Sequence, residues 1–427
     1  MTAADSPLLQ YRAPGITGVR AALFVLGATA LLAGAWARRS VNAFNDDSDA
    51  IIVATVRYHI THGHAPPAGL LYVTAGDSVY PSSSGLQGLL AGLAARRWAS
   101  DYRAMLPRPV SYPDAWYRQA EPLGIAIVAL KVASVVATAA VLAMFAFFVA
   151  ETWSLTGGLL LTGLLATSYW LAWWASNLYW ATPLLFLPFV VSWYAARAVR
   201  NGHMTMGAFT TCIGGLVFLK ALAGYEWLSC ILAAASVPIV YYAVRDHRPW
   251  RETVRRIGQV AGGGAAAAIA ALAVHLTQLA SARGSFGAAL GAFGGRAGHW
   301  LAGASFEPGY PPSGLVSRAF LSQELAALSA FRLPLWLFAM LLPVTATLAL
   351  YQSSRARTAA SRAAWRAAGI ALLYSLACSL SWPLLATTHM ASHLHLGLIV
   401  FFLPSALLLF ATPALAIEAH RLDRQPA

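Results

Sequence analysis

Charged side chains are scarce in this chain of 427 residues. Asp, Glu, Lys and Arg together make up 11% of it, whereas soluble proteins carry about 25%. Apolar runs of about 18 residues or more, long enough to cross a bilayer as a helix, recur from one end to the other. The low charge excludes an ordinary soluble globular protein, and the apolar runs predict an all-α polytopic membrane protein.

Cysteine is nearly absent, with three residues in the whole chain. Cys212, Cys230 and Cys378 each fall inside an apolar run. That placement excludes a framework of loop disulfides and a paired-cysteine metal motif. We expect all three to be packing residues.

Acidic residues are few, 16 against 29 Lys and Arg, so the net charge is +13. In a soluble protein this excess would suggest a nucleic-acid partner, but no basic stripe interleaved with aromatic residues is present. Arginine-rich cytoplasmic loops explain the excess better. We expect membrane lipid, and no nucleic acid, among the partners.

The apolar runs predict about ten spanning helices in a single transmembrane domain, residues 1–427. The predicted spans are 18–37, 123–149, 154–175, 179–197, 206–223, 226–244, 257–280, 333–352, 368–387 and 396–417. No small-residue cleavage site follows the first run, so we expect it to be a permanent helix. The seventh run is almost all small residues, which permits close helix contact.

The arginines predict that both termini face the cytoplasm. Arginines gather in alternate connections, as in "RDHRPWRETVRR" and "SSRARTAASRAAWR". The short turns between them hold no Lys or Arg, at 176–178, 223–226 and 388–395. This asymmetry places the latter turns on the non-cytoplasmic face. The Ala- and Arg-rich composition favours a bacterial inner membrane.

Two long loops, 38–122 and 281–332, are predicted on the outer face. In the first, residues 47–62 and 84–98 have helical periodicity, and we expect both helices to lie in the membrane interface. The second loop is rich in glycine and broken by prolines. It is either a mobile lid over a site or a connector with one short helix.

A cluster of carboxylates follows the first span, in "NAFNDDSDAIIVATVRYHITHGHAPP". Asp46, Asp47 and Asp49 stand at the head of the predicted helix 47–62. A carboxylate there can cap the helix, whose free N–H groups favour negative charge, or serve as a general base if its pKa is raised. Because adjacent residues do not share a helix face, one acid can cap while another points into a site.

Lys131 and Lys220 are the only lysines, and both lie in apolar runs. An ionisable group in the membrane is costly and is a functional candidate by default. Glu226 follows Lys220 across a predicted tight turn, so we expect the two to pair. The pair is either a structural salt bridge or a site in which Lys220 meets a lipid phosphate and Glu226 orients it.

Histidines and aromatic residues gather at the same predicted outer boundary. His389, His393 and His395 occupy one short turn, and can bind phosphate or sugar hydroxyls, hold a metal, or simply pack. The stretch "YWLAWWASNLYW" is either an interfacial aromatic belt or a platform for a sugar ring with Asn177 as hydrogen-bonding partner. The sequence predicts no fixed metal ligand set and no certain cofactor, and leaves a divalent cation open.

These features together resemble the GT-C superfamily of integral-membrane glycosyltransferases. The resemblance rests on the ten or so spans, the long first external loop with two surface helices, and the acid where the first span meets that loop. It implies that Asp46 or Asp47 is the catalytic base, and that Lys220, with Arg57, contacts the phosphate of a polyprenyl-phosphate-linked sugar donor. The stretches "YPSSSGLQGLL", "GYEW" and "HMASHLH" resemble uncharacterised bacterial membrane proteins of this kind, which adds Gln87 and Tyr225 as binding candidates.

The resemblance implies an inverting glycosyl transfer to a glycan, lipid or protein acceptor on the non-cytoplasmic face. A lipid-phosphate leaving group needs cationic stabilisation rather than a second carboxylic acid. A transporter or flippase of a lipid-linked substrate is the alternative, favoured by Lys131 alone, because such proteins place polar groups near the midplane. An acyl- or phosphoryl-transferase with a histidine-centred site comes third.

Overall fold

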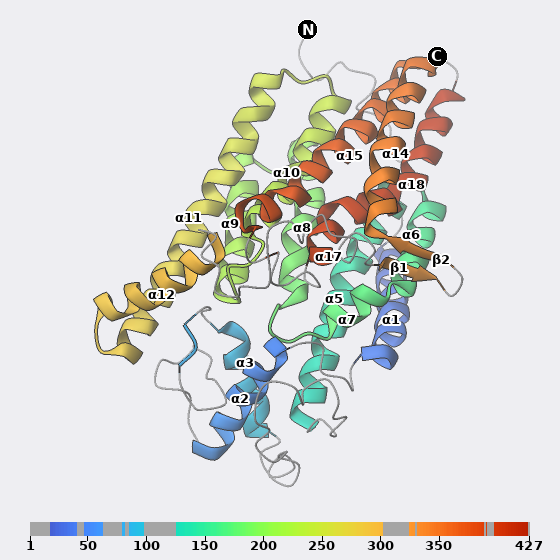
Figure 1. Ribbon diagram of the computed structural model, residues 1–427. Coiled ribbons are helices and arrows are strands. Elements are labelled where there is room, and N and C mark those ends of the chain that lie inside the picture. Colours follow the sequence, from blue (N-terminus) through green and yellow to red (C-terminus); the bar gives the residue numbers. More distant parts are fainter. Residues whose placement is uncertain are drawn as a thin grey trace.

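The computed structural model describes residues 18–40, 47–62, 79–81, 85–97, 125–301, 324–328, 331–387, 390 and 397–425. Helices dominate this part of the chain and pack side by side in one bundle (Figure 1). The predicted all-α membrane architecture is confirmed at this level. The division into one domain with two external loops stays a prediction.

The helices have the following bounds. The first half contains α1 (Gly18–Ser40), α2 (Asp47–His62), α3 (Leu86–Arg97), α5 (Ile125–Thr152), α6 (Leu155–Thr167), α7 (Tyr169–Ala175) and α8 (Thr182–Arg200). The second half contains α9 (Met206–Leu222), α10 (Leu228–Arg245), α11 (Trp250–Arg283), α12 (Phe286–Leu301), α14 (Leu335–Arg355), α15 (Ala359–Leu385), α17 (Gly397–Phe401), the π-helical turn η5 (Phe402–Ala406) and α18 (Leu407–Asp423). Beside them, β1 (Glu324–Leu328) and β2 (Phe331–Pro334) form a short antiparallel pair.

Each predicted span coincides with a helix or an interrupted helix. Eight described helices are long and apolar enough to cross a bilayer. The third predicted span is bent by 72° where α6 gives way to α7, and the bent pair would make a ninth. The fifth, α9, has only 17 residues. The described residues therefore support eight or nine spans by length and composition, with α9 as the shorter remaining member of the predicted ten.

Large apolar side chains cover the outside of the bundle. Leu26 on α1, Ile269 on α11 and Met340 on α14 are all more than half exposed, and Leu384 on α15 is 76% exposed. A soluble protein rarely leaves such continuous apolar surface open to water. The long apolar helices and their apolar outer faces mark the chain as a membrane protein.

Small residues let the helices approach closely, as the seventh predicted span suggested. On α11, Gly263 lies against Thr210 of α9, and Gly264 lies against Leu232 of α10. A Cβ at either glycine would overlap its neighbour. The contacts hold α11 against α9 and α10 by van der Waals packing, which drives helix association in lipid.

Local capping sets where several helices begin. Ser154, Ser168, Thr205 and Thr358 each accept a hydrogen bond from the backbone N–H three residues ahead, at 3.1–3.3 Å. These caps satisfy N–H groups that a helix start would otherwise leave without a partner. Ser168 thereby starts α7 anew and fixes the bend after α6.

The last span is interrupted at η5, where Leu403 leaves helical geometry. The carbonyl of Leu403 accepts hydrogen bonds from Cys230 Sγ at 2.9 Å and Ser379 Oγ at 3.3 Å. Side chains of α10 and α15 thus satisfy the freed backbone group, as the apolar surroundings require. The three cysteines form no disulfide; Cys212 is exposed and Cys378 is buried, but Cys230 does more than fill space.

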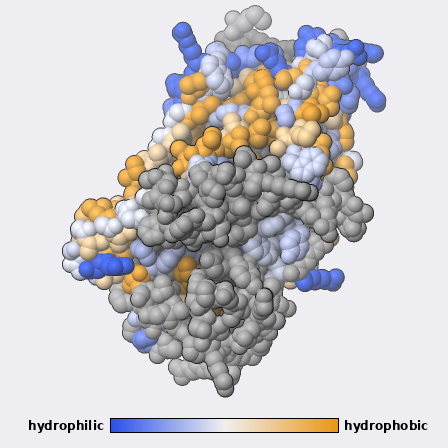
Figure 2. Space-filling model, in the orientation of Figure 1, coloured by the Kyte–Doolittle hydropathy of each residue, from blue (hydrophilic) through white to orange (hydrophobic). Residues whose placement is uncertain are grey.

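The arginine-rich connections gather at one end of the bundle. Arg200, at the end of α8, forms an ion pair with Asp246, which follows α10. Asp423, at the end of α18, accepts hydrogen bonds from the backbone N–H groups of Arg357 and Thr358, which lie between α14 and α15. Hydrophilic side chains cluster there, with apolar ones beneath (Figure 2). The opposite end carries α2, α3 and the α9–α10 turn (Figure 1).

The two helices predicted in the first loop are present as α2 and α3, and they pack on each other. Gly92 of α3 lies directly against the imidazole of His59 on α2. The polar residues Thr55 and His59 of α2 are buried. Leu89, Leu90 and Leu93 of α3 remain exposed, which suits the prediction that α3 lies on the membrane surface.

Candidate functional site

The turn between α9 and α10, residues 223–227, lies at the centre of the candidate site. Lys220, in the last turn of α9, is 0% exposed. Its ammonium donates one hydrogen bond, from Nζ to the carbonyl oxygen of Gly224 at 2.8 Å. An ammonium carries three donors, so two of them have no partner among the described residues. A buried cation needs an opposite charge or further hydrogen-bond acceptors close to it.

Glu226 faces the same point of the turn. Gly224 has a backbone φ of +139°, which other residues rarely adopt, and a Cβ there would overlap the Glu226 carboxylate and lie 3.6 Å from Lys220 Nζ. The two charged groups therefore both lie close to the position that a Cβ of residue 224 would take, although they do not form one of the ion pairs found among the described residues. Glu226 is 2% exposed. In place of the ion pair predicted from sequence, the structure has two buried, opposite charges beside one glycine.

Gln87, near the start of α3, ties this turn to the one between α7 and α8. Its Nε2 donates to the carbonyl oxygens of Tyr179 at 2.6 Å and Ala223 at 2.9 Å. Because two carbonyls need the donors, the amide oxygen must point the other way. That oxygen, Oε1, is buried without a hydrogen-bond partner in the part of the chain described here, so it is free to accept a bond from a ligand hydroxyl.

Tyr225 and His275 form a polar pair behind the turn. The phenol oxygen lies 3.0 Å from His275 Nδ1, and the two rings stack at 5.6 Å with Phe293 of α12 beside them. Burial first, and the Glu226 carboxylate second, raise the pKa of Tyr225 well above its ordinary value. The phenol therefore stays protonated. His275 Nε2 is buried and has no partner among the described residues.

Asn177 shapes the neighbouring turn instead of offering its carbonyl oxygen to a ligand. Its Oδ1 accepts the backbone N–H groups of Tyr179 at 3.0 Å and Trp180 at 3.1 Å. The side chain is wholly buried. Two bonds to backbone already occupy this acceptor, which makes the predicted contact with a sugar unsupported for Asn177.

The aromatic residues of this stretch pack mainly on one another. Trp180 lies 4.7 Å from Trp227 and 6.1 Å from Trp174 between ring centroids, and all three are buried. Tyr169 is the exposed member of the stretch. The geometry matches a packed aromatic core under the two turns more closely than an open platform for a sugar ring.

Both turns hold a non-glycine residue in the left-handed region of backbone conformation. Ala181 has φ +47° at the start of α8, and Trp227 has φ +64° at the start of α10. Each such residue costs about 1–3 kcal/mol and persists only where its surroundings enforce it. Such outliers cluster at functional sites, which adds weight to this end of the bundle.

Of the predicted site residues, Lys220, Glu226, Tyr225 and Gln87 meet around one turn, with Asn177 in the adjacent one. Asp46, His389, His393 and His395 lie outside the described residues, as do the side chains of Asp47 and Arg57. The helix that Asp47 begins, α2, is present as predicted. Lys131 is buried in the second turn of α5, close to one end of that helix.

His275 was not predicted as a site residue. It lies in the alanine-rich seventh span, which sequence alone suggested was a packing helix. Gln278, one turn further along α11, also has a buried side-chain oxygen without a partner among the described residues. The available signal in the sequence was the pair of His275 and Gln278, three positions apart near the end of a long alanine-rich run.

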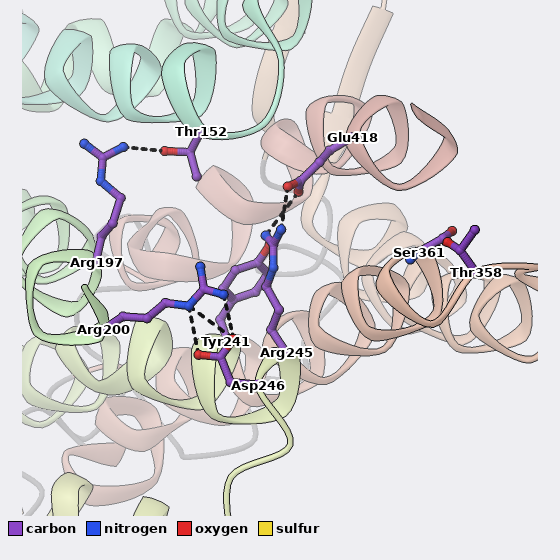
Figure 3. A network of polar contacts seen from close by, with 9 residues as sticks. All are labelled: Thr152, Arg197, Arg200, Tyr241, Arg245, Asp246, Thr358, Ser361 and Glu418. Carbon is purple, nitrogen blue, oxygen red and sulfur yellow. Dashed lines mark hydrogen bonds and ion pairs between the residues drawn. The ribbon is translucent and has the colours of Figure 1, made fainter. Parts of the chain in front are cut away.

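The other end of the bundle holds a closed network of ion pairs (Figure 3). Arg200 binds Asp246 through two nitrogens, Arg245 binds Glu418 at 2.8 Å, and Arg197 binds Glu151 at 2.7 Å. Tyr241 Oη also accepts a bond from Arg245. Because each charge here has a partner, the network links α5, α8, α10 and α18 structurally.

No group of three or more His, Cys, Asp and Glu side chains in the described ranges could hold a metal ion. The histidines 389, 393 and 395 fall outside those ranges. The described site thus offers hydrogen-bond donors and acceptors, one buried cation and one buried carboxylate, which is chemistry for a polar ligand that bears hydroxyl groups.

Compared with protein-family models, curated protein sequences and solved structures, the chain matches none of them.

Proposed function

We propose that the protein transfers a sugar from a polyprenyl-phosphate carrier to an acceptor at the end of the bundle that carries α2, α3 and the α9–α10 turn. This end faces away from the cytoplasm in a bacterial inner membrane. The observation that carries the proposal is the buried Lys220 ammonium, which makes one hydrogen bond to the described residues and has two further donors without a partner among them.

Lys220 binds the phosphate of the carrier. In a low-dielectric site, a fixed cation stabilises the charge that develops on a departing phosphate. Glu226, held beside Gly224, orients the ammonium and balances its charge before the phosphate binds. Because Lys220 is enclosed, the phosphate reaches it when a neighbouring segment moves aside.

Gln87 Oε1 and His275 Nε2 bind the sugar or the phosphate oxygens. Both atoms are buried and lack partners in the described residues, and both are fixed from behind: Gln87 by two backbone carbonyls, and His275 by Tyr225. Fixed polar groups lower the loss of side-chain freedom on binding.

The reaction is an inverting substitution at the anomeric carbon. Asp46 or Asp47 accepts the proton of an acceptor hydroxyl, and the hydroxyl oxygen forms a bond to that carbon. The bond from the carbon to the phosphate oxygen breaks, and polyprenyl phosphate leaves with the electron pair. An acid at the head of α2 suits a base, because α2 packs on α3, which carries Gln87.

A transporter of a lipid-linked substrate is the second candidate. The breaks in two spans, α6–α7 and η5, favour it, because broken helices form substrate sites in transporters. However, the freed carbonyl of Leu403 is bound by Cys230 and Ser379 and so is not open to an ion. Lys131, which favoured transport, lies near one end of α5.

The decisive experiment measures release of polyprenyl phosphate from a labelled lipid-linked sugar by the full chain in proteoliposomes. We expect Asp46→Asn or Asp47→Asn, and Lys220→Gln, to lower turnover by about a hundredfold or more, the usual effect of losing a charge-stabilising or proton-transfer group. Lys131→Gln, which also removes a buried lysine, is the matched control and should retain turnover.

Full turnover in both aspartate variants would refute the base assignment. Full turnover in Lys220→Gln would refute the phosphate contact. Movement of the intact lipid-linked sugar between leaflets, surviving the Asp and Lys220 substitutions and lost in Lys131→Gln, would establish the transporter in place of the transferase.

A further inference from the structure

Two adjoining hollows open at the arginine-rich end, away from the site described above. One, about 350 Å³, lies between the end of α14 and the start of α15. The other, about 250 Å³, lies between the α10–α11 turn and α15. His247 and Arg366 line both, so the hollows meet. The larger volume falls within the range of small-molecule sites.

The lining is basic. Arg362 and Arg366 are four residues apart on α15, so they share a face, where like charges repel by a few tenths of a kcal/mol. Neither forms an ion pair with any described residue. The described acids of this end interact with other groups. Four of them form ion pairs with arginines outside this pair: Glu151 with Arg197, Asp246 with Arg200 and Arg248, Glu252 with Arg248 and Arg256, and Glu418 with Arg245. The fifth, Asp423, accepts hydrogen bonds from the backbone N–H groups of Arg357 and Thr358. The hollow is left with net positive charge and no carboxylate in its lining.

His247 has an unusual backbone conformation. Its φ of +52° is left-handed, and it is the one non-glycine residue of that kind at this end among the described residues. It lines both hollows together with Arg366. Strained backbone of this kind persists where the surrounding structure enforces it, often at a binding site.

An apolar surface continues from the basic lining. On the same face of α15, Ile370 lines the hollow and Leu373, one turn further, is exposed. Trp250, at the head of α11, lines the rim and is 66% exposed, which is typical of tryptophan at the membrane interface. A ligand that fits has an anionic head and an apolar tail along α15.

We propose that this hollow binds the phosphate headgroup of an anionic phospholipid. Arg362, Arg366 and His247 contact the phosphate, and the acyl chains lie along Ile370 and Leu373. Basic pockets between helices at the membrane surface recognise lipid headgroups in this way. The proposal is independent of the transferase function and concerns the other end of the bundle.

The test is native mass spectrometry of the full chain in micelles that contain phosphatidylglycerol and phosphatidylcholine in equal amounts. We expect the unaltered protein to retain phosphatidylglycerol preferentially. Arg362→Gln with Arg366→Gln should weaken that binding about tenfold or more, from the loss of two cations near the surface. Binding of phosphatidylcholine should not change, which also shows that the variant is folded.

The matched control is Arg251→Gln with Arg255→Gln. These arginines have the same spacing, lie exposed at the same end on α11, and line neither hollow. Equal losses in both double variants, or no loss in either, would overturn the proposal, since only a diffuse charge effect would remain. A second variant, Arg362→Lys with Arg366→Lys, should keep the preference for phosphatidylglycerol, because the charge is retained. If this variant loses the preference as fully as the double Gln variant does, a charge-based site is also overturned.

A final arm separates lipid from free phosphate. Inorganic phosphate at millimolar concentration is added in place of phosphatidylglycerol, and the thermal unfolding midpoint is followed. We expect phosphatidylglycerol to raise the midpoint and phosphate to leave it unchanged. An equal rise with phosphate alone would show that the hollow takes a soluble anion and would refute the lipid assignment.

Discussion

At the scale of single residues, Lys220 and Gly224 define the candidate site. The ammonium rests on the Gly224 carbonyl oxygen at 2.8 Å, and the absent side chain of Gly224 makes room for the Glu226 carboxylate. With any other residue at this position, the Glu226 carboxylate could not keep its place. The chemistry of the turn therefore depends on a residue that carries no functional group.

We expect Gly224→Ala to destabilise the protein and to abolish its activity. The φ of +139° strains any other residue, at about 1–3 kcal/mol, and the added Cβ would also displace Glu226. Gly202→Ala is the matched control, because Gly202 has φ +76° but open space around it. The apparent free energy of unfolding in mixed micelles measures both. If both variants lose the same free energy of unfolding, the position of Glu226 does not depend on the missing side chain of Gly224.

Asn177→Ala should destabilise the α7–α8 turn by about 1–3 kcal/mol, because two buried N–H groups lose their acceptor. Asn201→Ala, at the turn after α8, is the control and should change stability little. The apparent free energy of unfolding in mixed micelles is measured for both variants. A stable Asn177→Ala variant that has lost turnover would instead restore Asn177 as a ligand contact.

At the scale of helices, two kinds of contact hold the bundle together. Close packing through Gly263 and Gly264 fixes α11 against α9 and α10, and paired charges join the helix ends at the arginine-rich side (Figure 3). The first kind acts within the apolar layer, where no water competes for contacts. The second acts where the helices leave it.

Gly264→Ala should lower the free energy of unfolding by about 1–3 kcal/mol, because its Cβ would overlap Leu232. Gly262→Ala on the same helix meets nothing within 4 Å and should be neutral or slightly stabilising, as alanine favours the helix over glycine. If the two variants unfold alike, α11 does not pack on α10 through Gly264.

A double-mutant cycle on Arg200 and Asp246 should give a coupling free energy of about 1–2 kcal/mol. Contacting residues in one network couple by about 0.5–3 kcal/mol, and this pair is bidentate and mostly shielded from solvent. The pair Arg256 and Glu252, within one helix, should couple by only about 0.3–0.5 kcal/mol. Chemical unfolding of the four variants of each pair measures both couplings. A smaller coupling for Arg200 and Asp246 than for the helical pair would contradict the tie between α8 and α10.

At the scale of the whole molecule, the two ends differ in kind. One end gathers arginines, ion pairs and the basic hollows, and the other gathers Lys220, Glu226, Gln87 and His275 around two strained turns. The helix α11 has 34 residues, about 50 Å at 1.5 Å per residue, and so extends past a hydrocarbon layer of about 30 Å. Its far end and α12 lie beside the candidate site.

Labelling from one side of the membrane tests this polarity. In a Cys212→Ser background, we expect an impermeant maleimide added to intact spheroplasts to modify Ser285→Cys, after α11, and to leave His203→Cys, after α8, unmodified. Both positions are exposed, and the remaining cysteines are buried. Labelling of His203→Cys alone would show that the orientation is the reverse of the one proposed. Labelling of both positions would contradict a bundle that spans the membrane.

The sequence by itself determined the class of molecule, the position of nearly every helix and the proximity of Lys220 and Glu226. Hydrophobic length and local periodicity depend only on neighbouring residues, and the short turn after α9 keeps two charged residues six positions apart in the sequence close together. Only the tertiary structure decided that Gln87 bridges Tyr179 and Ala223 and that His275 supports Tyr225. Those contacts join positions 50 to 136 residues apart, and which distant surfaces meet is set by the packing of whole helices.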